Sequence, residues 1–131
     1  MIYLDTSAFV KLVWSELESD ALSRFLMGRP ATPLVSSNLI TVETRRTAAR
    51  EDPSALARAD LLLTRIGRIG MTPSLIESAS RLPDRSLRSL AAIHLATALL
   101  LRENLDVVLT YDKSLAAAAE AHHLPVDSPG G

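Results

Sequence analysis

The stretch that decides the fold is Ile2-Tyr3-Leu4-Asp5-Thr6-Ser7-Ala8. Three apolar residues suited to a strand lead directly into an acid, two hydroxyl residues and the start of a helix. A second stretch of this kind, Asp106-Val107-Val108-Leu109-Thr110-Tyr111-Asp112, lies near the other end of the chain. Short buried strands that each lead into a helix predict an α/β domain with a mainly parallel central sheet flanked by helices.

We expect further strands at 33–36 and, at a sheet edge, 124–126. The helix start signals include a capping box at Ser15-Glu16-Leu17-Glu18 and the pairs Asp52-Pro53 and Thr72-Pro73. Helices are expected at 6–14, 15–28, 38–50, 53–66, 73–82, 88–103 and 113–122. With no repeat or linker in sight, residues 1–127 are expected to form one domain, followed by a short C-terminal tail, 128–131.

Composition narrows the class of protein. The chain has 131 residues, 47% of them hydrophobic, and no cysteine. Disulfides, thiolate metal sites and a cysteine nucleophile are therefore excluded, which fits a cytoplasmic protein. The N-terminus does not resemble a signal peptide. The apolar stretch 90–101 is shorter than the roughly 20 residues of a membrane span, so we expect a buried helix and no membrane partner.

Acids follow two of the predicted strands. Asp5 and Asp112 come after strands whose carboxyl ends meet at one edge of a parallel sheet, the usual place for a site. Glu43, in the helix after the second strand, is a third candidate. Each has a simpler explanation: both aspartates could only cap helices, and Glu43 could lie on a solvated face.

Grouped carboxylates have a chemical consequence. They repel one another, and a hard cation such as Mg²⁺ or Mn²⁺ relieves that repulsion. A water on such a cation ionises more readily and can attack phosphorus. Histidine offers no competing site, because His94 is expected to be packed and hydrogen-bonded, and the adjacent His122 and His123 point in different directions on a helix.

Four segments in order resemble a known family. The opening residues 2–8, Glu43, the run Leu87 to Ala98 and the segment 109–112 are similar to those of PIN domains, and in particular of VapC toxins from toxin–antitoxin pairs. The resemblance extends from residue 2 to about 126. It implies a Mg²⁺- or Mn²⁺-dependent endoribonuclease acting on structured RNA, commonly a tRNA or an rRNA loop. It also implies a homodimer inhibited by a VapB-like antitoxin.

The same resemblance assigns site residues. Asp5, Glu43 and Asp112 match the acidic catalytic and metal-binding positions, and Ser7 and Thr110 match hydroxyl positions that brace them. The central helix departs from the pattern, because Ala91 stands where the family usually has a fourth aspartate. Alanine cannot bind a metal, so we expect weak or absent cleavage by this chain. We interpret Ala91 as an engineered inactivation, with a naturally degenerate, non-catalytic binding module as the alternative.

Charge suggests where RNA would bind. The net charge is −1, yet residues 45–88 hold nine arginines and five acids. Arg46 and Arg50 lie one and two turns beyond Glu43 on the same helix face and could hold phosphates. Solvated helix faces are the alternative explanation.

Two other classes of protein, one of enzymes and one of signalling domains, also have an aspartate after the first strand. A haloacid-dehalogenase-type phosphotransferase needs a second aspartate two residues later, where this chain has Ser7. A two-component receiver domain needs a phospho-accepting aspartate after a middle strand, which Val35-Ser36-Ser37 does not offer. A non-catalytic partner-binding protein is a third alternative, which Ala91 favours.

Overall fold

The computed structural model describes all residues, 1–131, and contains a five-stranded sheet in which every pairing is parallel. The strand order is β3-β2-β1-β4-β5. Along the chain, the strands are β1 (Ile2–Leu4), β2 (Leu34–Ser37), β3 (Gly67–Ile69), β4 (Val107–Leu109) and β5 (Val126–Asp127). The predicted α/β class with a mainly parallel sheet is confirmed, and β1 lies at its centre.

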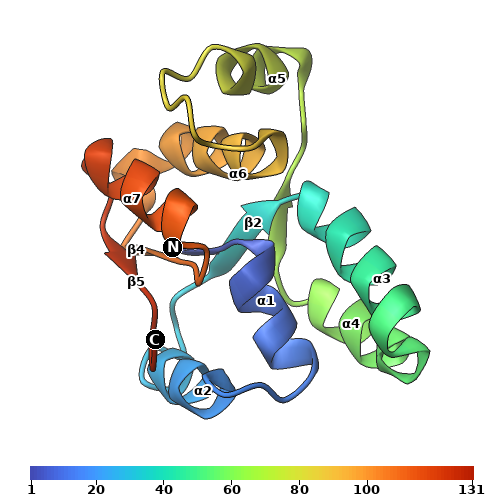
Figure 1. The fold of residues 1–131 in the computed structure, drawn as a ribbon. Coiled ribbons are helices and arrows are strands. Elements are labelled where there is room, and N and C mark those ends of the chain that lie inside the picture. The colour runs from blue at the N-terminus through green and yellow to red at the C-terminus, as the bar shows by residue number, and fades with distance from the viewer.

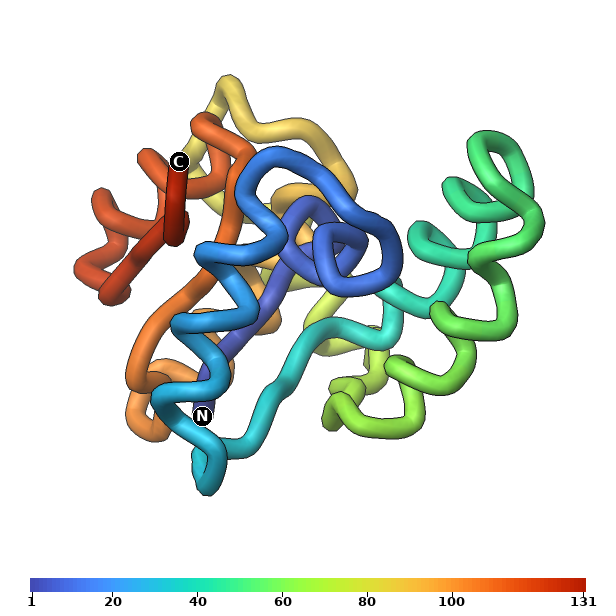
Figure 2. Tube along the Cα trace, turned by 90° about the horizontal axis from the view of Figure 1, so that it is seen from below, coloured from blue at the N-terminus to red at the C-terminus, as the bar shows by residue number.

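Seven α-helices surround the sheet. They are α1 (Thr6–Val13), α2 (Ser19–Met27), α3 (Leu39–Glu51), α4 (Leu56–Leu63), α5 (Pro73–Ser80), α6 (Ser89–Leu100) and α7 (Lys113–Ala121). Short 3₁₀ helices at Pro53–Ala55 and Arg102–Asn104 precede α4 and follow α6. Figure 1 shows α1 and α2 on one side of the sheet and α6 and α7 on the other, with α5 stacked outside α6. In Figure 2 the α3–α4 pair lies at one side of the molecule, away from the C-terminus.

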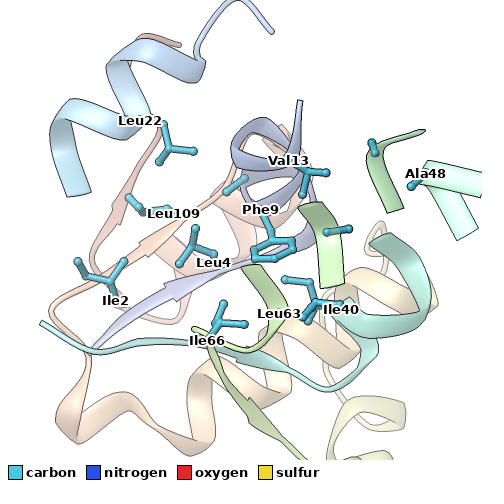
Figure 3. Close-up of a cluster of buried hydrophobic side chains, with 13 residues drawn as sticks. Ile2, Leu4, Phe9, Val13, Leu22, Ile40, Ala48, Leu63, Ile66 and Leu109 are labelled. Carbon is cyan, nitrogen blue, oxygen red and sulfur yellow. The ribbon is translucent and has the colours of Figure 1, made fainter. Parts of the chain in front are cut away.

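The alternation of side chains in β1 divides the core in two. Ile2 and Leu4 point into a cluster formed with α1 to α4, which Figure 3 shows packed around Phe9. Tyr3 points into a second cluster formed with α6 and α7. Successive side chains of a strand face opposite sides, so a strand buried on both faces must be apolar throughout, as β1 is.

Two sequence predictions differ from the structure. The helix expected from Ser15 begins at Ser19, because Glu18 pairs with Lys11 at 2.7 Å and Ser19 Oγ accepts the N–H of Glu16 at 2.8 Å. The expected capping box is therefore wrong. Strand β3 was not predicted, since a three-residue edge segment containing a glycine and an arginine carries almost no strand signal.

The other start signals act as predicted. Asp52 accepts the N–H of Ser54 ahead of the 3₁₀ turn that leads into α4, and Thr72 accepts the N–H of Leu75 at the start of α5. At the C-terminus, Tyr111 donates to the carbonyl of Pro129 at 2.7 Å, so the last residues contact the loop after β4. None of the helices combines the length and hydrophobicity needed to cross a bilayer.

Candidate functional site

A cavity of about 480 Å³ opens at the carboxyl edge of the sheet. It lies beyond the ends of β1 and β4 and beside the first turns of α1, α6 and α7. The structure brings all four positions of the expected acidic cluster to this cavity, although they come from opposite parts of the chain. The lining residues are Asp5, Thr6, Ser7, Glu43, Arg88, Ser89, Leu90, Ala91, His94, Asp112 and Leu115.

Asp5 is buried at the centre of the site, with 4% of its surface exposed. Its Oδ1 accepts the Ala8 N–H at 3.0 Å, which caps α1, and the Ser7 hydroxyl at 2.7 Å. Its Oδ2 accepts the Thr110 hydroxyl at 2.6 Å. Burial raises the pKa of the Asp5 carboxyl, against the lowering effects of the nearby His94 and of these hydrogen bonds. Asp5 therefore caps α1 and lines the cavity at the same time.

Ser7 and Thr110 tie Asp5 to the loop after β4. Thr110 Oγ1 accepts the N–H of Asp112 at 3.1 Å, and Ser7 Oγ accepts the N–H of Tyr111 at 2.9 Å. Each hydroxyl thus donates to Asp5 while accepting from the backbone of the neighbouring loop. The two hydroxyls fix the β1 and β4 ends relative to each other.

Asp112 caps α7. Its Oδ1 accepts the N–H groups of Ser114 and Leu115 at 2.9 and 3.2 Å, and its Oδ2 has no hydrogen-bond partner. One oxygen therefore orients the carboxylate and the other remains open to a ligand in the cavity. As with Asp5, the cap explanation and the site explanation do not exclude each other.

Glu43 is partly buried and is engaged through a single oxygen. Its Oε1 accepts from the Thr6 hydroxyl at 2.5 Å and lies 2.9 Å from Nε2 of His94. Burial acts to raise the pKa of this carboxyl, but the bonds from His94 and Thr6 outweigh it and hold the pKa below its usual range. Glu43 is therefore not a solvated glutamate on a helix surface.

Ala91 lines the main cavity and also a neighbouring hollow of about 320 Å³, together with Arg88, Asp112 and Ser114. Its methyl group supplies no donor or acceptor. The central helix thus contributes a wall to the cavity at the position where an aspartate would contribute a charge.

The donor types suit a hard divalent cation, but the set is incomplete. Asp112 Oδ2 and Glu43 Oε2 lack partners, and carboxylate oxygens are the ligands that Mg²⁺ and Mn²⁺ prefer. No group of three or more Asp, Glu or His side chains lies close enough to hold one metal ion. The side chains are therefore of the right chemical kind for such a cation, but Asp5, Glu43 and Asp112 are not grouped closely enough to hold one ion between them.

The predicted phosphate-binding pair lies elsewhere. Neither Arg46 nor Arg50 lines the cavity, and Arg50 pairs with Glu51 at 3.1 Å. The arginine that does line the cavity is Arg88, which takes part in none of the ion pairs of the chain. Arg88, Thr6 and His94 were not selected from the sequence as site residues. For Arg88 the available signal was its place just before the central helix motif.

Comparisons with known proteins identify the family and the fold of the chain. The PIN domain family model matches residues 2–121. Ribonuclease VapC35 of Mycobacterium tuberculosis is 41% identical over 132 residues, 99% of this chain and 98% of the relative. The crystal structure of M. tuberculosis VapC20, a sarcin-ricin loop cleaving toxin, gives a TM-score of 0.72 at 22% identity over 90% of this chain and 95% of that one. A toxin–antitoxin complex from Klebsiella pneumoniae gives 0.68 at 20% identity over 88% and 91%.

Proposed function

Because the chain belongs to the PIN-domain family, we propose that it is a VapC-type endoribonuclease toxin whose present form is impaired by Ala91. The observation that carries this proposal is the convergence of Asp5, Glu43 and Asp112 on one cavity that Ala91 also lines. The whole-chain identity to a ribonuclease supports the same reaction class. The family match leaves no place for the dehalogenase-type and receiver-domain alternatives.

The residues divide into distinct roles. Asp5 and Asp112, joined by Glu43 once the cluster draws together around the ion, would hold Mg²⁺ or Mn²⁺. Such an ion would supply activation of water and neutralisation of charge on the scissile phosphate. Ser7 and Thr110 keep the Asp5 carboxylate oriented through bonds of 2.7 and 2.6 Å. Burial makes an unpaired negative charge on Asp5 costly, and a bound cation would offset that cost.

The substrate is structured RNA, such as a tRNA or an rRNA loop. The relatives named as ribonucleases support this class. Arg88 is placed to contact a phosphate at the cavity, since arginine presents donors in a geometry that suits phosphate oxygens. Arg46 and Arg50 remain predicted contacts for a more distant part of the RNA.

The proposed partners follow from the toxin assignment. A VapB-like antitoxin would bind and inhibit the chain, and the likeness to a solved toxin–antitoxin complex supports that kind of partner. We also propose a homodimer in the cytoplasm, where the RNA substrate and the antitoxin are found. A non-catalytic module that binds an antitoxin or RNA is the second candidate, favoured by Ala91 alone.

The deciding experiment restores the missing acid. Purified Ala91→Asp is incubated with total tRNA and rRNA and with Mg²⁺ or Mn²⁺, and new RNA ends are mapped by sequencing. We expect cleavage to rise by more than the roughly 10–100-fold that groups merely orienting metal ligands contribute. Ala91→Asn, which has nearly the same shape without the charge, is the matched control and stays near the starting rate.

The result also distinguishes the two candidates. Metal-dependent cleavage by Ala91→Asp, abolished by EDTA, is expected for the toxin. If Ala91→Asp cuts no RNA under these conditions, the endoribonuclease proposal fails and the non-catalytic module is preferred. Thermal unfolding with millimolar Mn²⁺ adds a second readout, because a cation that binds only the folded chain raises its melting temperature. Mn²⁺ is expected to raise the melting temperature of Ala91→Asp more than that of the unchanged chain.

A further inference from the structure

A chain of hydrogen bonds runs from the core to the cavity. Tyr3 is completely buried, and its Oη lies 2.7 Å from Nδ1 of His94. His94 is 4% exposed, and its Nε2 lies 2.9 Å from Glu43 Oε1. Tyr3 does not itself line the cavity. A side chain on the central strand is thus linked to a carboxylate of the site through one histidine.

The proton positions follow from counting donors and acceptors. The N–H of Ser37 donates to Tyr3 Oη at 3.2 Å and occupies one of its lone pairs. Burial raises the pKa of the Tyr3 hydroxyl, which keeps its proton. The Glu43 carboxylate only accepts, which places the ring proton on Nε2, and the 2.7 Å contact then assigns the Tyr3 proton to Nδ1 of His94. The Nε2–H then donates to Glu43.

The arrangement restricts Glu43 to one free oxygen. Both of its partners, His94 and Thr6, bond to Oε1, and Oε2 has none. A glutamate on a helix normally samples several rotamers, and fixing it costs conformational entropy. Two donors on the same oxygen overcome that cost and leave the other oxygen for whatever occupies the cavity.

We propose that Tyr3 and His94 are positioning residues that hold Glu43 as an acceptor through Oε2 alone. Their consequence for cleavage rests on the proposed function, whereas the hydrogen-bond assignment stands without it. A histidine that served only core packing could end its hydrogen bonds on backbone groups. Here the chain of bonds ends on a carboxylate of the cavity wall.

The first test is spectroscopic and uses the chain as it stands. Long-range ¹H–¹⁵N correlation is expected to show His94 protonated at Nε2, with Nδ1 as a hydrogen-bond acceptor. Tyr3→Phe removes the donor and shifts the Nδ1 resonance towards that of an unbonded nitrogen. The other tyrosine of the chain gives the matched control, because Tyr111→Phe deletes a hydroxyl that bonds only to Pro129.

The Tyr111→Phe spectrum is expected to leave both His94 nitrogens unchanged. An Nδ1–H tautomer, or a doubly protonated ring, would overturn the assignment. A Tyr3→Phe spectrum with unmoved His94 resonances would overturn it as well. Thermal unfolding of both variants shows whether each is folded when the spectra are recorded.

The second test uses Ala91→Asp as the background. Tyr3→Phe is expected to lower kcat about 10-fold, as loss of a group that orients a ligand does, with KM for RNA unchanged. Tyr111→Phe keeps the background kcat. Equal losses in the two variants would contradict a positioning role. If Ala91→Asp itself cuts no RNA, the proposed function fails, and the spectra still decide the hydrogen-bond assignment.

A second variant covers the case in which Tyr3→Phe does not fold. His94→Gln keeps a side-chain N–H that can reach Glu43, whereas His94→Ala removes it. We expect His94→Gln to recover part of the kcat that His94→Ala loses. Identical kcat values for these two variants would count against the proposal.

Discussion

At the level of single residues, Asp5 combines two tasks that the sequence presents as alternatives. Its Oδ1 caps α1 and its Oδ2 bonds to Thr110, so the helix start aims the carboxylate at the strand ends. Asp112 does the same at α7 with one oxygen and keeps the other free. A capping aspartate after a parallel strand is therefore a poor argument against a site, since the cap provides the orientation that a site requires.

The raised pKa of Asp5 predicts a stability that depends on pH. A buried acid with a raised pKa contributes stability that is present below its unfolded pKa, about 3.9, and is lost as the pH rises through the folded value. Relative to Asp5→Asn, the unchanged chain should lose unfolding free energy over that interval at up to about 1.4 kcal/mol per pH unit. Above the folded pKa the difference becomes constant.

Urea unfolding from pH 3 to 8, in EDTA to remove metal ions, measures this difference. Asp60→Asn is the control, because Asp60 is exposed and pairs with Arg45 on the surface. A difference between the unchanged chain and Asp5→Asn that does not vary with pH would show that the folded pKa of Asp5 is not raised.

At the level of elements, helix starts were predictable where the capping side chain bonds only to N–H groups two or three residues away. Asp52-Pro53 and Thr72-Pro73 lie next to the N–H groups that they cap. The Ser15 box failed because Lys11, on the preceding helix, takes the carboxylate of Glu18. Cap motifs compete with contacts between helices, and a single sequence does not show which contact prevails.

Helix α5 offers a test of capping that is separate from the site. Thr72 accepts the Leu75 N–H at 3.1 Å, so Thr72→Ala is expected to lower the free energy of unfolding by about 1 kcal/mol. Ser74→Ala, in the same turn and without a side-chain hydrogen bond, is expected to change it by less than about 0.5 kcal/mol. Both are measured by urea unfolding, and equal values for the two variants would contradict the capping role.

At the level of the whole molecule, ion pairs decide which arginines are available. Arg45, Arg50 and Arg81 pair with acids on the surface. Arg88 has no such partner and lines the cavity. Ion pairs thus neutralise three of the nine arginines between residues 45 and 88, and Arg88 is the one of the nine that lines the cavity.

This distribution makes a prediction about RNA binding. Single-stranded RNA binding weakens with salt in proportion to the phosphates contacted, with a slope of about 0.7 per contact. Arg88→Gln is expected to reduce that slope by about one contact, and Arg65→Gln, an exposed arginine outside the cavity, to leave it unchanged. Fluorescence anisotropy of a labelled RNA against KCl concentration measures both.

Arg46→Gln and Arg50→Gln belong in the same series. If the salt dependence of RNA binding decreases in these variants but not in Arg88→Gln, the phosphate contact lies on α3 and the assignment to Arg88 is wrong. All four variants carry the same substitution, so the comparison tests position and not charge alone.

The sequence alone determined the parallel α/β class, the strand-end aspartates Asp5 and Asp112, the family and the departure at Ala91. These features depend on neighbours in the chain: a short apolar strand, a cap within three residues and a motif of a few positions. Glu43 was a weaker candidate that the resemblance strengthened, because nothing in its own helix distinguishes it from a solvated glutamate.

Only the tertiary structure decided what surrounds those residues. The bond from His94 to Glu43 spans 51 positions and that from Tyr3 to His94 spans 91. The edge strand β3 exists because β2 offers it a parallel partner. Arg88 reaches the cavity because α6 begins there. Contacts of this range arise when separate helices and strands pack together, and local sequence patterns do not record them.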